Sequence, residues 1–193
     1  MQLDAQNFLD LTEATHKLAM WDTESTGLAG DYGSIICASV KPYGKVPVTF
    51  AVEQVGNDRK VVRELADYLA TFEGWATYYG KGHDVPLVNT RLVRWGLPPL
   101  VRRPHLDLYF VVKHRTKTGR RSQAHLLEFL EETMEDLGIE PASKMTLSPG
   151  VWADLARKFT ANMRLLRMRC ESDTVGLEAL YRMTRRLVRD ITR

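Results

Sequence analysis

The chain has little cysteine, no long apolar run and no strong excess of one charge. Its two cysteines, Cys37 and Cys170, are too few for a disulfide framework and lack a metal-binding spacing. We therefore expect a reduced, cytoplasmic protein. No stretch approaches the roughly 20 apolar residues that span a bilayer, so we expect no membrane contact. The first residues lack the basic start and apolar core of a signal peptide, which predicts no export.

The composition is that of an ordinary globular protein. Over 193 residues, 44% are hydrophobic and 26% are charged, which predicts a single domain over 1–193 with its own core. The net charge of +3 permits a polyanionic partner without demanding one. Basic residues concentrate in 113–121 and again in 164–193, whereas 128–136 is acidic. The basic segment 113–121 either contacts phosphates or is merely solvated, and the sequence leaves both readings open.

The first part of the chain predicts three strands in succession. Residues 16–21 form a mostly apolar run that ends at Asp22, and 34–40 and 46–52 have a similar character. Short turns between them indicate an antiparallel meander. Pro47 favours an edge position or a strand start for the third segment, because proline cannot donate to a sheet ladder.

Beyond residue 52 the hydrophobic period changes to that of a helix. Apolar residues at helical spacing predict a helix over 58–72. The remaining elements are a short strand at 75–79, a helix at 84–95, an ambiguous segment at 105–112, and helices over 123–137 and most of 151–191. The order β-β-β-α-β-α followed by helices predicts an α/β fold, in which helices cover the faces of a mixed sheet.

Three acidic segments are candidates for chemistry. Asp22 and Glu24 lie two residues apart on a predicted strand, so both carboxylates can face one metal ion. Asp84 follows a glycine-rich turn and begins a predicted helix, where it could instead be a simple N-cap. Asp173 lies within the last helix, and a surface pair with Arg169 is the plain alternative.

Together these segments resemble the DEDD (DnaQ-like) 3′→5′ exonucleases, in particular the ribonuclease H-like branch that ends in a Tyr-Cys-x-x-Asp-Val helix. Asp22 and Glu24 match the motif Asp-x-Glu-Thr-x-Gly-Leu, in which Ser25 replaces the threonine. Asp84 matches the motif Tyr-Asn-Gly-x-x-Phe-Asp-x-Pro, and Asp173 matches the third motif. Further matches are His105-Leu-Asp107-Leu, Leu137-Gly-Ile139, Lys144 and Trp152. The predicted element order is also that of a ribonuclease H-like fold.

Three positions depart from the family pattern. Tyr79 replaces the usual asparagine of the second motif, and His83 replaces its phenylalanine. Arg169 stands four residues before Asp173, where the family carries tyrosine or histidine. Arginine stays protonated at working pH and cannot be a general base. The residue that activates the water is therefore not evident from the sequence.

The resemblance implies a metal-dependent 3′→5′ exonuclease that hydrolyses phosphodiester bonds in single-stranded DNA or RNA with two Mg²⁺ or Mn²⁺ ions. The implied metal ligands and catalytic residues are Asp22, Glu24, Asp84 and Asp173. The implied substrate-binding residues are Thr26, Gly27, Leu28, His83 and Arg169, with Leu28 as a wedge against the terminal base. Two alternatives stay open: a catalytically silent nucleic-acid-binding module, and a metal-dependent endonuclease of similar fold.

Other polar candidates have simpler interpretations. His16, His114 and His125 lack metal spacing and are expected in the core or on the surface. His105 is expected to be structural. Asp107 is either a buried residue that caps a helix or ends a strand, or a fifth metal ligand.

Overall fold

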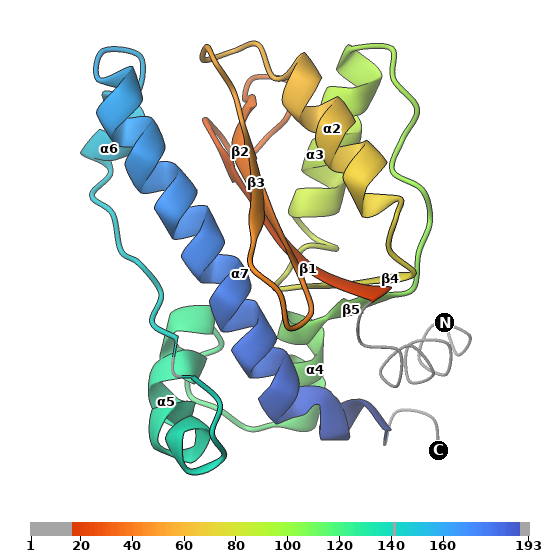
Figure 1. Ribbon diagram of the computed structural model, residues 1–193, viewed down its shortest axis with the longest axis vertical. Coiled ribbons are helices and arrows are strands. Elements are labelled where there is room, and N and C mark those ends of the chain that lie inside the picture. Colours follow the sequence, from red (N-terminus) through yellow and green to blue (C-terminus); the bar gives the residue numbers. More distant parts are fainter. Residues whose placement is uncertain (1–16, 141, 190–193) are drawn as a thin grey trace.

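A computed structural model describes residues 17–140 and 142–189 (Figure 1). Its centre is a five-stranded sheet with the order β3-β2-β1-β4-β5. The strands are β1 (Leu18–Ser25), β2 (Ile35–Pro42), β3 (Val48–Ala51), β4 (Gly74–Thr77) and β5 (His105–Asp107). The first three strands pair antiparallel, as the meander predicted, whereas β4 and β5 join β1 in parallel. Strand β1 is therefore central, and β3 lies at an edge, as Pro47 indicated.

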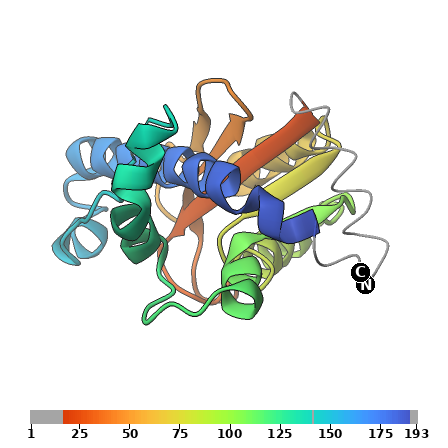
Figure 2. The ribbon, with the colours of Figure 1, turned by 90° about the horizontal axis from the view of Figure 1, so that it is seen from below.

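Helices cover both faces of this sheet, which confirms the predicted α/β architecture (Figures 1 and 2). They are α2 (Arg59–Leu69), α3 (Asp84–Arg94), α4 (Leu108–Arg115), α5 (Gln123–Asp136), α6 (Gly150–Ala153) and α7 (Phe159–Arg189). Side chains of β1 alternate between the two layers. Ala19 and Trp21 pack in the core with α2 and α3, while Leu18 and Met20 pack with α4, α5 and the second half of α7. None of the helices in 17–140 and 142–189 is long and apolar enough to cross a membrane.

Several predicted elements need correction. The apolar run 16–21 delivers Asp22 on a strand, as predicted, but β1 does not end there: it continues to Ser25, because pairing with β2 extends past the apolar run. The ambiguous segment 105–112 is both a strand and a helix, with β5 ending at Asp107 and α4 beginning at Leu108. The last helical region is divided into α6 and α7. His16 and Ile191 lie outside the described residues.

A buried ion pair joins α2, α3 and β2. Asp58, fully buried before α2, receives two hydrogen bonds from Arg91 of α3, at 2.8 and 3.0 Å. The same carboxylate accepts from the backbone N–H of Ile35, at 2.8 Å, and from the indole of Trp95, at 2.7 Å. Arg91 also donates to the carbonyl of Gly30, at 2.8 Å. This network fixes the loop that follows β1 against α3.

Candidate active site

Two neighbouring elements bring three carboxylates together. Asp22 and Glu24 lie on β1, and α7 crosses this strand and contributes Asp173. One ligand atom from each of the three lies within 4.8 Å of the others. Glu24 and Asp173 are buried, at 7% and 3% exposure. Asp22 and Glu24, two residues apart on β1, therefore place their carboxylates on the same side of the strand, as their spacing predicted.

Asp84 lies beside this group from the direction of α3. It is the first residue of that helix, and its carboxylate accepts hydrogen bonds from the backbone N–H of Thr23, at 3.1 Å, and the Thr23 hydroxyl, at 2.6 Å. The N-cap position belongs to His83, so the simple N-cap interpretation of Asp84 is wrong. Asp84 is outside the group of three, but its charge raises the pKa of Asp22. Its bond to Thr23 anchors α3 to β1.

All four carboxyl groups have a raised pKa. For Asp22 the largest cause is burial, followed by the charges of Asp84, Asp173 and Glu24, and its pKa lies well above the usual value. Burial is also the main reason that the pKa of each of the other three carboxyls is raised. Low solvation and mutual repulsion therefore favour either protons or added cations at this site.

Two basic side chains partly balance the carboxylates. Arg169 Nε lies 2.5 Å from Glu24 Oε1 and 3.9 Å from Asp173 Oδ2, and Lys144 Nζ lies 3.0 Å from Asp173 Oδ2. The Arg169 guanidinium also lies 5.2 Å from the centre of the Trp152 ring. Arg169 therefore faces the carboxylates, as its position one helical turn before Asp173 indicated. A role for Lys144 or Trp152 was not inferred from the sequence, although both matched positions in the family pattern.

The donor set fits a hard divalent cation. The Oδ1 atom of Asp173 is buried and has no hydrogen-bond partner within 17–140 and 142–189. A buried oxygen without a partner is costly, and a cation would supply the missing interaction. Carboxylate oxygens prefer Mg²⁺ or Mn²⁺ to softer metals. Asp22, Glu24 and Asp173 could hold such an ion, with Asp84 close by.

The carboxylates line an open pocket of about 530 Å³. Its walls include almost every residue that the resemblance implied, Asp84 excepted. The lining residues are Asp22, Thr23, Glu24, Ser25, Thr26, Gly27, Leu28, His83, Lys144, Pro149, Trp152, Arg169 and Asp173. Leu28 projects into solvent with 88% of its surface exposed. The loop that carries it is held by reciprocal bonds between Thr26 and Ser34, at 3.0 and 2.9 Å.

Asp107 has a structural role in the turn between β4 and α3. Its two carboxylate oxygens accept from the backbone N–H groups of Tyr79, at 2.8 Å, and Lys81, at 2.9 Å, and it also caps α4 through Tyr109. The capping interpretation is therefore correct. His105 pairs with the Thr77 hydroxyl at 2.8 Å, consistent with a structural role.

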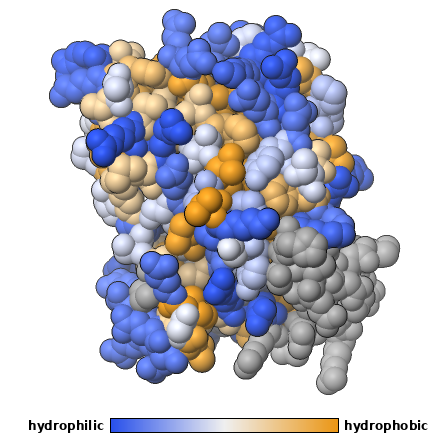
Figure 3. All heavy atoms as spheres, viewed as in Figure 1, coloured by the Kyte–Doolittle hydropathy of each residue, from blue (hydrophilic) through white to orange (hydrophobic). Residues whose placement is uncertain are grey.

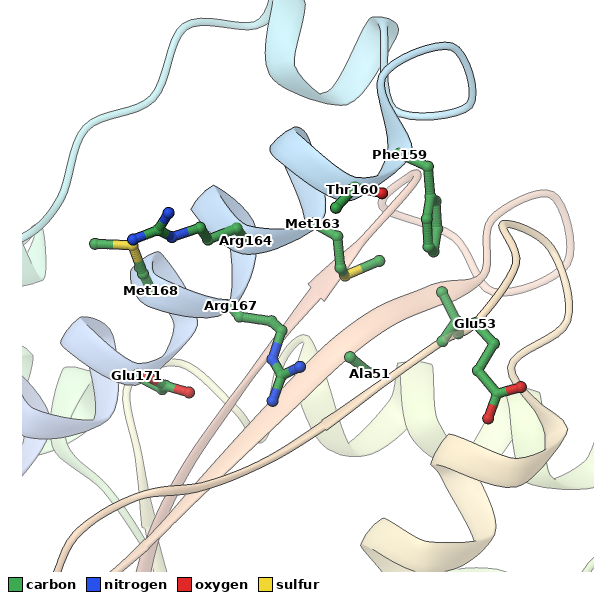
Figure 4. A pocket seen from close by; sticks show the side chains of 10 residues that line it. Ala51, Glu53, Phe159, Thr160, Met163, Arg164, Arg167, Met168 and Glu171 are labelled. Atoms are coloured by element: carbon green, nitrogen blue, oxygen red, sulfur yellow. The ribbon is translucent and has the colours of Figure 1, made fainter.

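A larger hollow, about 700 Å³, lies between β3 and the N-terminal half of α7 (Figure 4). Met163, Arg167 and Glu53 are among its lining residues. The face shown in Figure 3 has apolar patches among hydrophilic side chains. This hollow contains none of the clustered carboxylates.

Comparison with known proteins agrees with this architecture. The model of the RNase_H superfamily matches residues 19–184. The family B DNA polymerase from the hyperthermophilic archaeon Pyrobaculum calidifontis is similar with a TM-score of 0.68 and 20% identity, over 86% of this chain and 24% of the polymerase chain. A structure described as the apo form of a nuclease has a TM-score of 0.57 and 19% identity, over 95% and 79% of the two chains. No curated protein matches.

At such identities the two structures show likeness of fold alone, and the chain spans about a quarter of the polymerase chain (24%). The family model, in contrast, extends from β1, which carries Asp22, to α7, which carries Asp173. Together with the mixed sheet and its flanking helices, this match shows that the chain belongs to the ribonuclease H superfamily.

Proposed function

We propose that this chain is a divalent-metal-dependent 3′→5′ exonuclease that hydrolyses phosphodiester bonds of single-stranded nucleic acid. The observation that carries the proposal is the convergence of Asp22, Glu24 and Asp173 beside Asp84, with a buried oxygen of Asp173 left without a partner. The pocket is open, and part of its rim is the loop that follows β1. This loop could hold the end of a nucleic-acid strand. A polyanionic substrate would be repelled by four carboxylates unless cations intervened, which links activity to metal.

Asp22, Glu24, Asp84 and Asp173 would hold two Mg²⁺ or Mn²⁺ ions, directly or through water. When bound, the ions supply the acidity that activates a water molecule and the positive charge that stabilises the leaving 3′ oxygen. Thr23 orients Asp84 through two hydrogen bonds, so this carboxylate has one preferred direction. The protein thus contributes carboxylate oxygens from side chains that are largely buried.

The end of the strand would be held by Thr26, Gly27 and Leu28. The exposed Leu28 side chain can pack against the terminal base, and the backbone of this loop can approach the sugar. His83 lines the same pocket and lies within reach of a phosphate. These roles rest on the residues' position around the carboxylates.

Arg169 would compensate carboxylate charge and contact a non-bridging phosphate oxygen. It already pairs with Glu24, and its planar guanidinium suits a phosphate. Lys144, which pairs with Asp173, is placed for a similar role. Because arginine does not accept a proton, water activation must depend on the metal or on another group, for which His83, a residue of the pocket lining, is a candidate.

A catalytically silent nucleic-acid-binding module is the second candidate function. The contacts of Arg169 with Glu24 and of Lys144 with Asp173 favour it, because cationic side chains can neutralise carboxylates where metal would otherwise bind. An endonuclease is the third candidate. The three differ in whether strands are cut and in whether a free end is needed.

Linear and circular single strands of the same sequence, DNA and RNA, separate these functions. We expect linear strands to be degraded in millimolar Mg²⁺ and to remain intact in EDTA. Circular strands should remain intact in both conditions, because they have no 3′ end. Cleaved circles would indicate an endonuclease instead. Binding without cleavage in Mg²⁺ or Mn²⁺ would establish the silent module. Asp22→Asn and Asp173→Asn serve as controls for a contaminating nuclease.

A further inference from the structure

An aromatic cluster lies beside the turn that precedes α3. The Tyr79 ring centre is 5.0 Å from that of Tyr109 and 6.1 Å from that of Phe110, and Phe110 stacks with His114 at 6.3 Å and 12°. Tyr79 is 46% exposed. We call Tyr79, Tyr109, Phe110 and His114 the aromatic platform. None of these residues lines the carboxylate pocket.

The platform is not needed to fill the core. On α4, Leu108, Val111 and Val112 are buried against the sheet and α7. Tyr109 and Phe110 are half-buried and His114 is exposed, so they occupy the outer side of the helix. Aromatic rings gathered on an outer surface are suited to stacking with a partner.

Tyr79 has an unusual backbone conformation. Its φ is +64°, the only positive value for a non-glycine residue in 17–140 and 142–189. The Asp107 carboxylate holds this turn through the N–H groups of Tyr79 and Lys81. Gly82 packs against the Tyr79 ring so closely that a Cβ would lie 2.6 Å from it. The turn thus presents a large ring where the family usually has asparagine, a residue that tolerates positive φ.

The same turn connects the platform to the carboxylate pocket. Gly82 contacts Tyr79 and also lines a hollow of about 300 Å³ that includes Leu28 and His83. Leu28 and His83 in turn line the carboxylate pocket. The carboxylate pocket, this hollow and the Tyr79 turn are therefore adjacent, so a nucleic-acid strand whose end lies among the carboxylates could extend toward Tyr79.

Positive charge flanks the platform. Residues 113–121 contain five lysines and arginines and no acidic residue. The Lys113 ammonium lies 5.9 Å from the centre of the Phe110 ring, and the Tyr78 hydroxyl donates to the carbonyl of Arg121, which joins the loop to the turn. Figure 2 shows the segment between α4 and α5 as an open loop at this edge of the molecule. Aromatic rings beside basic side chains suit unpaired bases joined by phosphates.

We propose that the aromatic platform binds unpaired bases of a single strand, upstream of the nucleotide held at the carboxylates. This inference deepens the proposed function and rests on it for the identity of the substrate. The rings stack with bases, and the basic segment 113–121, which comprises the end of α4 and the loop after it, neutralises the adjoining phosphates. The platform would therefore favour single strands over duplexes, whose bases are already stacked.

The test measures binding of fluorescent single strands without divalent metal, in an Asp22→Asn background. One abasic site is moved along the strand, one nucleotide at a time. We expect a position at which the missing base weakens binding about five- to a hundredfold. Tyr79→Asn should abolish the penalty at that position, because asparagine accepts the backbone conformation but cannot stack. Tyr79→Phe should retain it.

Phe129→Ala is the matched control, because Phe129 is an exposed ring (66%) on α5 beside Glu128, Glu131 and Glu132, where no strand should bind. If Tyr79→Asn fails to fold, Phe110→Leu tests the same platform. Unchanged binding and an unchanged abasic penalty in these platform variants would overturn the proposal. If Tyr79→Asn weakened binding of intact and abasic strands by the same factor, the proposal would also be overturned. Such a result would mean that the substitution disturbs the protein in general and removes no base stacking.

Failure of the proposed function is distinguishable from failure of this inference. A wild-type protein that cuts no strand in any divalent metal, yet shows the Tyr79-dependent abasic penalty, retains the platform and loses the nuclease activity. Metal-dependent cleavage from the 3′ end with no Tyr79-dependent abasic penalty would support the nuclease activity and overturn the platform.

Discussion

Arg169 is the residue whose chemistry differs most from the family pattern. It lies among the carboxylates, within 2.5 Å of Glu24, and its guanidinium packs over Trp152. This position excludes a purely surface role. It also means that the charge of Glu24 is partly balanced before any metal binds, so under the proposed function Arg169 would affect both metal binding and contact with phosphate.

We predict that Arg169→Ala lowers turnover by roughly ten- to a thousandfold, because the reacting phosphate would be without one electrostatic partner. Arg169→Lys should recover only part of this activity, because lysine cannot bind a phosphate in a bidentate manner. Initial rates on a short single strand at saturating Mg²⁺ measure the effect. Undiminished turnover in Arg169→Ala would remove Arg169 from phosphate binding.

We predict that Asp22 makes the stability of the fold depend on pH and on divalent metal. A carboxyl whose pKa is raised by folding stabilises the fold while it is protonated, so that contribution is present at low pH and is lost as pH rises through the raised pKa. Without metal, the melting temperature should therefore fall with rising pH in this range. Millimolar Mg²⁺ should restore it at neutral pH, because the ion binds the folded site and not the unfolded chain.

Asp22→Asn removes one repelling charge, so the metal-free variant should be at least as stable as the wild type at pH 7 and should lose most of the Mg²⁺ increment. Melting curves with Mg²⁺ and with EDTA measure both. A variant that is less stable without metal and keeps the full increment would contradict the assignment of Asp22 as a ligand.

At the scale of elements, the Asp58–Arg91 pair fixes α3 relative to β2 and to the loop that follows β1. Arg91→Met leaves a fully buried carboxylate without its cation, which should cost about 3–5 kcal/mol of unfolding free energy. Urea denaturation measures this change. Arg94→Met is the matched control, because Arg94 is an exposed arginine on the same helix. Equal effects of the two substitutions would show that the ion pair does not hold the elements together.

The elements that sequence periodicity predicted best are those with long apolar patterns, such as α2 and α5. The apolar run 16–21 does not mark where β1 ends, because pairing with β2 continues past it to Ser25. The three residues of β5 are too few to show a period before α4 begins. A hydrophobic period can be recognised only over several residues, so short elements cannot be predicted from it.

The candidate site was predictable in part for a different reason. The spacing of Asp22 and Glu24 is local, and a strand makes its consequence certain. The bond between Asp84 and Thr23 joins residues 61 positions apart, and no local pattern encodes it. The pairing of Lys144 with Asp173 likewise depends on how the segment before α6 packs on α7. Tertiary contacts of this kind need the fold.

At the scale of the whole molecule, the net charge is small (+3), but acidic and basic side chains gather in different places. Carboxylates gather at β1 and α7, and basic residues gather in 113–121. Replacing Arg120 and Arg121 with glutamine should flatten the dependence of strand affinity on salt, by about one unit of log–log slope for each phosphate that the loop no longer neutralises. Binding titrations between low and moderate salt measure the slope. An unchanged slope would mean that this loop is only solvated.

The most direct test of the central claim follows a 5′-labelled single strand over time at increasing Mg²⁺ concentrations. The wild type should shorten it progressively from the 3′ end, and only when metal is present, because the clustered carboxylates need cations to admit a phosphate. Asp173→Asn should leave the strand intact. The same ladder of products from Asp173→Asn, or from the wild type in EDTA, would contradict a metal-dependent exonuclease built on Asp22, Glu24, Asp84 and Asp173.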